Sequence, residues 1–241
     1  MSEPFLTRDG VTLRLTRHER GSSAAVLVVP GIFIHRESAE HRLVAERLSE
    51  VADVISLDVR GHGDSGGAFT FGLREPDDVA EVAAFLRDRY RKVAGLGFSF
   101  GGYNVAVAAA QHRCFDAVAL VGTPHRLFIL DHNFLTQGLL RSLPWMLRRR
   151  RRLTRLGVGA LRGRPAPSDI VGRIAPTPLL IAHGTDDWLI PAEHARILYR
   201  QAADPKRLLM IEGGLHAENI LAADPDSLLT PLAAFLSDAL R

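Results

Sequence analysis

A serine flanked by glycines, Gly97-Phe98-Ser99-Phe100-Gly101, is the segment whose residue types and spacing best suit covalent chemistry. An apolar run at 93–96 precedes it, and a helix-forming stretch at 103–110 follows it. In a tight strand-to-helix turn, the serine oxygen stands clear of the sheet at a helix N-terminus, which favours developing negative charge. Side chains two residues before and after that serine would collide, so glycine is used at both places. The pattern predicts a nucleophile elbow; an ordinary turn with an incidental serine is the alternative.

The chain downstream of Ser99 offers the two partners that a serine nucleophile needs. A serine hydroxyl is a poor nucleophile near neutral pH, so a base must take its proton, and a carboxylate must orient that base. Asp186 and Asp187 follow one predicted strand, and His216 follows the next. The C-terminal ends of strands are where open α/β sheets build their sites. These residues therefore suit a Ser-His-Asp arrangement.

The elements that must position these residues alternate along almost the whole chain. Apolar β-type runs are followed by segments with apolar residues on one helical face, which predicts an α/β fold with a mostly parallel sheet covered on both faces. The predicted strands are 11–16, 24–29, 53–57, 93–96, 117–121, 178–182 and 207–211. The predicted helices are 37–51, 76–91, 101–112, 192–202 and 225–240.

One segment, from about 124 to 176, interrupts this alternation within a single domain spanning 1–241. It holds eleven arginines but only two aspartates, whereas the whole chain carries a net charge of only +3. Its many large apolar residues are broken up by prolines. The interruption leaves the domain just past a predicted strand, close to Ser99. It therefore reads as an insertion that could line an apolar pocket.

Composition indicates an ordinary globular protein with no cofactor signature. Of the 241 residues, 46% are hydrophobic and 24% charged, which suits one α/β domain with a sizeable core. The single cysteine, Cys114, excludes an intramolecular disulfide and any cysteine-based metal cluster. No signal peptide or membrane-spanning run is visible, so we expect a cytoplasmic protein. No zinc-site spacing such as His-Glu-x-x-His occurs, so we expect no metal.

On the residues above, the chain resembles the α/β-hydrolase superfamily over essentially its whole length. The resemblance implies that Ser99 is the nucleophile, His216 the general base and Asp187 the acid. Asp187 is preferred to Asp186 because the family's acid stands four residues before a proline, here Pro191. Asp186 is then a turn or capping residue. The family's insertion at 124–176 implies a small helical cap over the active site.

The resemblance also implies an oxyanion hole built from backbone N–H groups. The segment Pro30-Gly31-Ile32-Phe33 follows a predicted strand, where relatives more often have His-Gly and an aromatic residue. Ile32 is the preferred first donor and Phe33 the alternative. Phe100, directly after the nucleophile, supplies the second donor.

Several further residues receive weaker assignments. Phe33, His35, His125 and Trp188 are expected to border the substrate pocket. His183 is interpreted as a structural residue, and the remaining histidines of interest are interpreted as solvent-facing: His18, His41, His112 and His194. The glycine-rich loop 58–66 lacks the Lys-Ser/Thr pair of a phosphate-binding loop, so Arg60 and Asp64 are expected to tie it beside the elbow.

These features predict a cofactor-independent serine hydrolase that cleaves a carboxylic ester with an acyl or other apolar group. A thioesterase, an acyltransferase, a carbon–carbon bond hydrolase and a non-catalytic small-molecule receptor remain alternatives. The apolar segment 139–147 followed by Arg148 to Arg152 suggests contact with an anionic membrane, against the simpler interpretation of a solvated helical face. A single basic run without a recognition motif does not indicate nucleic-acid binding.

Overall fold

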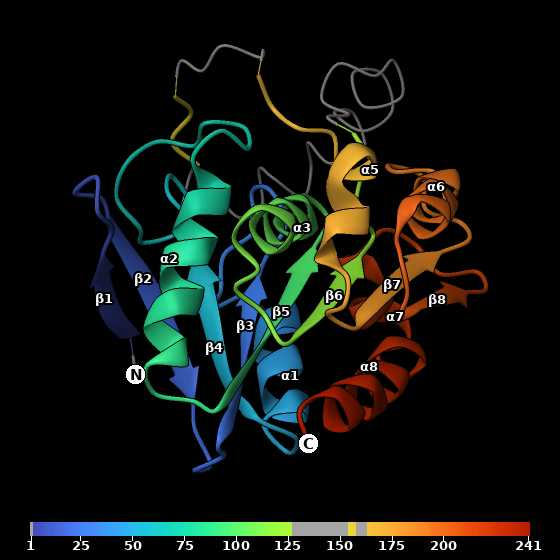
Figure 1. The fold of residues 1–241 in the computed structure, drawn as a ribbon, viewed down its shortest axis with the longest axis horizontal. Helices are drawn as coiled ribbons and strands as arrows, with labels where there is room; N and C mark the ends of the chain where they lie inside the picture. Colours follow the sequence, from blue (N-terminus) through green and yellow to red (C-terminus); the bar gives the residue numbers. More distant parts are fainter. Residues whose placement is uncertain (1, 127–153, 158–162) are drawn as a thin grey trace.

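The computed structural model describes residues 2–126, 154–157 and 163–241. Its centre is an eight-stranded sheet in the order β1-β2-β4-β3-β5-β6-β7-β8. The first two pairings, β1 with β2 and β2 with β4, are antiparallel, and all the others are parallel. The predicted α/β fold with a mostly parallel sheet is therefore confirmed (Figure 1). The strands are β1 (Ser2–Leu6), β2 (Thr12–His18), β3 (Ala24–Val29), β4 (Asp53–Asp58), β5 (Lys92–Phe98), β6 (Ala117–Val121), β7 (Leu179–Gly184) and β8 (Lys206–Ile211).

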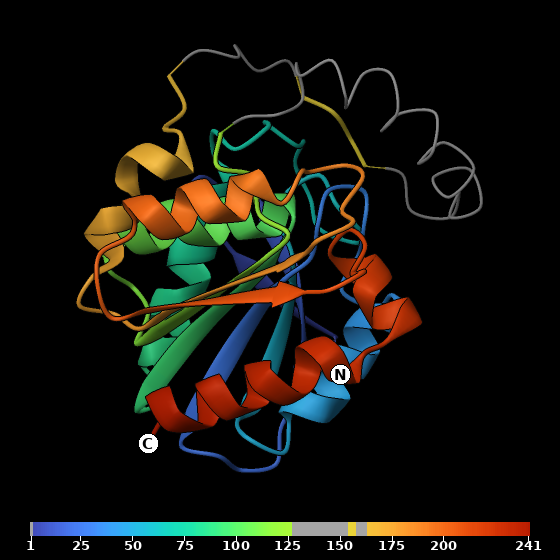
Figure 2. The same cartoon turned by 90° about the vertical axis from the view of Figure 1, so that its right-hand side faces the viewer.

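Helices cover both faces of this sheet, as Figure 2 shows edge-on. Those that pack on one face are α2 (Glu75–Arg87), α3 (Phe100–His112), α5 (Pro167–Ile170), the 3₁₀ helix η2 (Val171–Ile174) and α6 (Glu193–Gln201). Those on the other face are α1 (Ala39–Leu48), α7 (Glu218–Ala223) and α8 (Asp226–Ala239).

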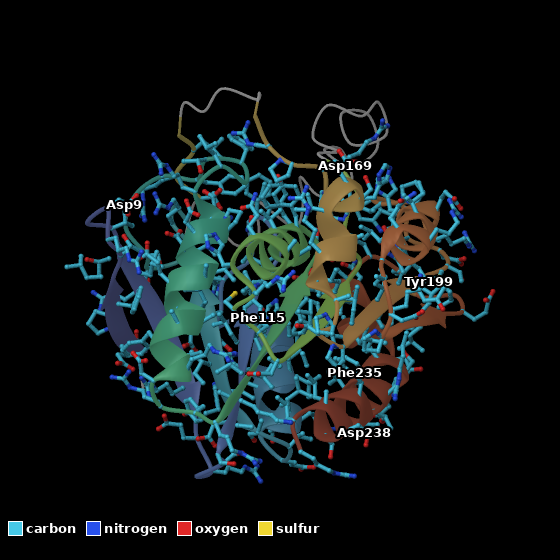
Figure 3. The ribbon with its side chains drawn as sticks, viewed as in Figure 1. Asp9, Phe115, Asp169, Tyr199, Phe235 and Asp238 are labelled. Atoms are coloured by element: carbon cyan, nitrogen blue, oxygen red, sulfur yellow. The ribbon has the colours of Figure 1, made fainter. Side chains whose placement is uncertain are left out.

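The two faces hold separate apolar clusters, because side chains alternate across each strand. In β3, Ala25, Leu27 and Val29 belong to the cluster under α2 and α3, whereas the residues between them belong to the cluster under α1 and α8. Phe115 lies in the first cluster and Phe235 in the second (Figure 3). Burial on both faces explains why these strands are continuous apolar runs.

Helix α2 illustrates how the sequence fixes the bounds of an element. Pro76 and three acidic residues occupy its first turn, where a missing N–H and negative charge are both favourable. The residues Val79, Val82, Ala83 and Leu86 share its buried face at helical spacing. The predicted helix 76–91 is too long at its end, because the N–H groups at 89 and 90 both return to the Leu86 carbonyl and close the last turn.

The predicted strands and helices include neither the 3₁₀ helix η2 nor three further elements, β1, α5 and α7. Strand β1 has no apolar run, because its residues alternate between exposed and half-buried at the edge of the sheet. Helix α7 has only six residues and α5 only four, so neither spans enough turns for a helical period to be read. Each is stabilised by tertiary packing rather than by a local pattern.

The described part of the predicted insertion is tied to the neighbouring loops. The Arg155 carbonyl accepts from the Phe69 N–H at 2.7 Å, and the Arg155 N–H donates to Gly61 at 2.8 Å. Helices α5 and η2 pack against α3. The apolar and arginine-rich segment predicted to contact membranes, 139–152, lies outside the described residues.

The loop after β4 is held by ion pairs of Arg60 and Asp64, of which only Arg60 with Asp78 is buried on both sides, and the two residues have different partners. Arg60 pairs with Asp78 of α2 at 2.5 Å and with Asp9 of the β1–β2 turn at 2.8 Å. Asp64 lies 3.3 Å from the guanidinium of Arg36, which follows β3. The loop is thus fixed to α2 and to the chain after β3.

Candidate active site

Ser99 occupies the sharp turn between β5 and α3. Its backbone lies at φ 51° and ψ −118°, a region that residues with a Cβ rarely adopt. A Cβ added at Gly97 would lie 2.5 Å from the Gly101 carbonyl oxygen, and one added at Gly101 would collide with the Val29 carbonyl. The Ser99 N–H donates to the Val121 carbonyl at 2.7 Å. The turn therefore has the strand–turn–helix geometry of a nucleophile elbow.

The structure brings Ser99, His216 and Asp187 together from three separate loops. His216 Nε2 lies 2.9 Å from Ser99 Oγ, and His216 Nδ1 lies 2.7 Å from Asp187 Oδ2. All three residues are at most 6% exposed. The neighbouring Asp186 is exposed, and its backbone N–H donates to Gly214. The carboxylate beside the histidine is therefore Asp187, as the proline spacing predicts.

Asp187 is held as a carboxylate by a dense set of donors. Its Oδ1 accepts from the N–H groups of Leu189 and Ile190 at 2.9 and 2.8 Å. Its Oδ2 also lies 3.2 Å from His183 Nε2. Burial alone would raise the pKa of Asp187, but the charge of His216 and the hydrogen bonds from His183 and His216 hold it well below its usual range. His183 is thus a buried positioning partner of Asp187, consistent with its structural interpretation.

The same arrangement makes His216 a stronger base. Burial alone would lower its pKa, but the charge and hydrogen bond of Asp187, with a further contribution from Glu218, raise the pKa above its ordinary value. Nδ1 faces the carboxylate, so in the neutral ring the lone pair on Nε2 points at Ser99 Oγ. Proton transfer from Ser99 to Nε2 is therefore geometrically direct.

The predicted oxyanion loop, residues 30–33, lies directly against the nucleophile. A Cβ added at Gly31 would be 3.2 Å from Ser99 Cβ. The Ile34 N–H closes the turn by donating to the Gly31 carbonyl at 3.2 Å, and Phe33 has a φ of 66°. Among the described residues, no acceptor takes the N–H of Ile32 or of Phe33. Both donors named from the sequence are thus in the turn beside Ser99.

The second predicted donor, Phe100, is the first residue of α3. Backbone N–H groups in the first turn of a helix point toward its N-terminal end, which here is the end at Ser99. The Phe100 ring is buried and stacks on Tyr103, with centroids 5.0 Å apart, and meets Phe69 edge-on. This packing fixes the backbone directly after Ser99.

The four predicted substrate-binding residues all lie past the C-terminal ends of parallel strands, and all are half-buried. Phe33 and His35 follow β3, and Trp188 adjoins Asp187 after β7. His125, four residues after β6, packs its ring against that of His194 of α6, with centroids 4.6 Å apart and the planes tilted by 55°. Their loops follow β3, β6 and β7, and so leave the same edge of the parallel sheet as the loops after β5 and β8 that carry Ser99 and His216 (Figure 1).

Two histidines interpreted as solvent-facing are buried. His41 is 0% exposed and lies 3.2 Å from Glu218, and His194 is 9% exposed. The spacing of His41, Val44, Ala45 and Leu48 places all four on one face of α1, so helical periodicity was the signal for His41. Glu218 carries no comparable signal, because its partners are distant in the sequence.

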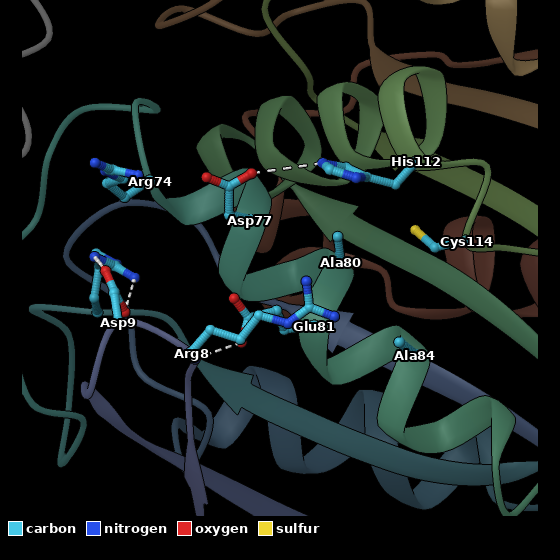
Figure 4. Close-up of a pocket in the computed structure, with 10 residues that line it drawn as sticks. Arg8, Asp9, Arg74, Asp77, Ala80, Glu81, Ala84, His112 and Cys114 are labelled. Carbon is cyan, nitrogen blue, oxygen red and sulfur yellow. Dashed lines mark hydrogen bonds and ion pairs between the residues drawn. The ribbon is translucent and has the colours of Figure 1, made fainter.

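A separate hollow of about 490 Å³ lies between α2 and the far end of α3 (Figure 4). His112 lies 13 helical residues from Ser99, a distance of about 20 Å. Four of its charged or titratable groups form two pairs, Arg60 with Asp9 at 2.8 Å and His112 with Asp77 at 3.5 Å. The hollow is therefore distinct from the Ser-His-Asp set. Its lining residues are Arg8, Asp9, Arg60, Arg74, Asp77, Ala80, Glu81, Ala84, His112 and Cys114.

Two searches of the described residues bear on metals and membranes. In residues 2–126, 154–157 and 163–241, no group of three or more His, Cys, Asp or Glu side chains is arranged to hold a metal ion. Within the same ranges, no helix has the length and apolarity needed to cross a bilayer.

Comparison with known proteins places the chain in a family. The family model for the alpha/beta hydrolase fold matches residues 24–164, so the chain belongs to the alpha/beta hydrolase fold family.

Individual relatives and structures agree with this placement. Protein ABHD12B of Homo sapiens is 29% identical over 220 residues, covering 83% of this chain and 58% of that protein. Serine hydrolase BPHL of Homo sapiens is 24% identical over 228 residues, covering 85% and 77%. The esterase Pf2001 of Pyrococcus furiosus has a TM-score of 0.80 at 20% identity, covering 100% of this chain and 91% of that one. For several curated relatives, the match spans only 56 to 62% of their length.

Proposed function

We propose that this protein is a serine hydrolase that cleaves carboxylic esters with an acyl or other apolar group. The observation that carries the proposal is the continuous hydrogen-bonded line from Ser99 Oγ through His216 to Asp187, with contacts of 2.9 and 2.7 Å. Support also comes from membership of the alpha/beta hydrolase fold family. The names of two similar proteins, a serine hydrolase and an esterase, point the same way.

In the proposed reaction, Ser99 Oγ attacks the substrate carbonyl carbon while His216 Nε2 takes the hydroxyl proton. The tetrahedral oxyanion accepts hydrogen bonds from the N–H groups of Ile32 and Phe100. His216 then gives its proton to the leaving alcohol, and the acyl group stays on Ser99. Water, deprotonated by His216, releases the acid and restores the serine. Asp187 holds the imidazole in the required tautomer and stabilises its charged form.

The pocket for the apolar group is proposed to form at the C-terminal edge of the sheet. Phe33, His35, His125 and Trp188 border it from the loops after β3, β6 and β7, and the insertion at 124–176 acts as a cap over it. No cofactor or metal takes part in the proposed reaction. The arginine-rich segment at 148–152 is proposed as a secondary contact with anionic lipid.

The experiment is hydrolysis of p-nitrophenyl esters, from acetyl to palmitoyl, by the wild type and by Ser99→Ala. We expect hydrolysis in the wild type, a preferred chain length and no activity above background in the variant. Activity that persists in Ser99→Ala would refute the assigned nucleophile. If the folded wild type cleaves no ester, the proposal fails. Thioesters of the same acyl chain lengths would then test for a thioesterase, and a saturable binding assay would test for a receptor.

A further inference from the structure

A buried carboxylate–imidazole pair, Glu218 and His41, lies behind the Ser-His-Asp set without belonging to it. Glu218 Oε1 lies 3.2 Å from His41 Nε2, and the two side chains are 5% and 0% exposed. The same oxygen accepts a 3.0 Å hydrogen bond from the Gly31 N–H. An isolated carboxylate is strongly unfavourable in such a position. The two hydrogen bonds to this one oxygen therefore compensate the carboxylate for its burial.

The pair adjoins three of the four segments that carry the proposed chemistry: the elbow, the oxyanion loop and the segment of His216. Glu218 stands two residues after His216 and begins α7, and its hydrogen bond to Gly31 reaches the oxyanion loop. The ring of His41 packs edge-on against Phe98, the residue directly before Ser99, with centroids 5.0 Å apart. His41 itself is held by the start of α1, where its N–H donates to the Ser38 hydroxyl at 3.3 Å.

Glu218, the oxyanion loop and Ser99 are packed closely against one another. A Cβ added at Gly31 would lie 3.0 Å from Glu218 Oε1 and 3.2 Å from Ser99 Cβ. A Cβ at Gly31 would therefore require the carboxylate or the nucleophile to shift by a few tenths of an ångström. The next N–H along the chain belongs to Ile32, the proposed oxyanion donor. Loss of the Glu218 acceptor would free the peptide that precedes this donor.

The charge of Glu218 also acts on the general base. Burial alone would raise the pKa of Glu218, but the hydrogen bond and charge of His41, together with the charge of His216, hold it below its ordinary value. Glu218 is therefore ionised at neutral pH. In the described chain, the titratable groups that act on Glu218 are His41 of α1 and His216. Those that act on His216 are Asp187 and Glu218.

We propose that Glu218, supported by His41, is a positioning residue that holds the oxyanion loop against the nucleophile and keeps a negative charge beside the general base. The proposal deepens the proposed function and rests on it, since its roles are defined relative to Ser99 and His216. The two roles use different properties of one carboxylate, its acceptor oxygen and its charge, so different substitutions separate them.

The test uses three variants of the full chain. Glu218→Gln keeps an oxygen that can accept from the Gly31 N–H and from His41 but removes the negative charge. Glu218→Ala removes both the acceptor oxygen and the charge. Glu212→Gln is the matched control, because Glu212 lies in the same loop, four residues before His216, and is exposed to solvent, where its charge is screened. Thermal unfolding checks that each variant is folded.

The first readout is NMR and needs no substrate. The pKa of His216 is measured from its ring resonances, and protection of the Gly31 N–H is measured by hydrogen exchange. We expect Glu218→Gln to lower the pKa of His216 while Gly31 stays protected. We expect Glu218→Ala to lower that pKa and also to accelerate exchange at Gly31. Glu212→Gln should change neither. The proposal would be overturned if both variants fold and both retain the wild-type His216 pKa and the wild-type exchange rate of the Gly31 N–H.

The second readout is ester hydrolysis. Loss of a hydrogen bond to a charged group predicts that kcat of Glu218→Ala falls roughly 10- to 100-fold, with KM little changed. The acidic limb of the Glu218→Gln profile should move to lower pH. An inactive wild type would refute the proposed function, whereas the NMR result still decides the role of Glu218. Should Glu218→Ala not fold, a wild-type His216 pKa in Glu218→Gln overturns the charge role.

Discussion

The backbone of Ser99 lies at φ 51° and ψ −118°, so glycine at this position should release strain that alanine retains. Holding a residue with a Cβ in such a region requires roughly 1–3 kcal/mol. Both substitutions remove the hydroxyl and its 2.9 Å contact with His216, so that loss cancels between the two variants. The greater conformational freedom of glycine in the unfolded chain favours unfolding, and it offsets about 0.5–1 kcal/mol of the strain that glycine releases. We therefore expect Ser99→Gly to be more stable than Ser99→Ala by roughly 1 kcal/mol.

Urea denaturation, followed by tryptophan fluorescence, measures this difference in the free energy of unfolding. In a thermal melt, each kcal/mol should move Tm by roughly 2–4 °C in a chain of this size. The matched control is Ser237, which lies within α8. There the ordinary helical backbone predicts the opposite order, with Ser237→Gly less stable than Ser237→Ala by about 1 kcal/mol. If Ser99→Gly proves no more stable than Ser99→Ala, the elbow is not strained and the reasoning is refuted.

Four further predictions concern the site and its support. Asp187→Asn should lower kcat roughly 10³- to 10⁴-fold, whereas Asp186→Asn, at the exposed neighbouring position, should leave kcat unchanged; equal effects in the ester assay would contradict the assignment. Because protonated His216 cannot act as a base, kcat/KM should fall on the acid side with a midpoint above the ordinary 6.5, and a midpoint below that value would count against the raised pKa. Burial lowers the pKa of His62 from 6.5 to about 4. As pH falls below 6.5, His62 is therefore protonated in the unfolded state before it is protonated in the folded state. The free energy of unfolding should therefore drop by about 3 kcal/mol between pH 6.5 and 4, and His62→Phe should flatten that dependence in urea titrations. Gly101→Ala should lower the free energy of unfolding by about 1–3 kcal/mol, because its Cβ meets a backbone carbonyl of β3; wild-type stability would show that the contact is not tight.

Much of the fold was readable because local patterns and burial agree. The strands β3, β4, β5 and β6 are apolar runs buried on both faces, and such runs are visible in the sequence alone. The edge strand β1 was not predicted because three of its five residues are exposed and no apolar run marks it. Helix ends were predicted less accurately, since α1 begins two residues later and ends three residues earlier than the predicted 37–51.

The candidate site was readable in part for a different reason. The chemistry of Ser99, His216 and Asp187 depends on residue type, and their loops follow strands that the pattern reveals. The choice between Asp186 and Asp187 rested on one proline, and the structure decides it by the 2.7 Å contact with His216. Which loops lie side by side is a property of sheet order, which local periodicity does not contain.

The sequence by itself determined the strand–helix alternation and the glycines that let the chain turn at Ser99, because both follow from local steric and hydrophobic rules. It also determined that a serine, an aspartate and a histidine each follow the end of a strand. Only the tertiary structure decided that Glu218 meets Gly31 across 187 residues and His41 across 177. Contacts of that kind depend on how α1 and α7 pack on one face of the sheet, and burial then makes their charges strong enough to act on the site.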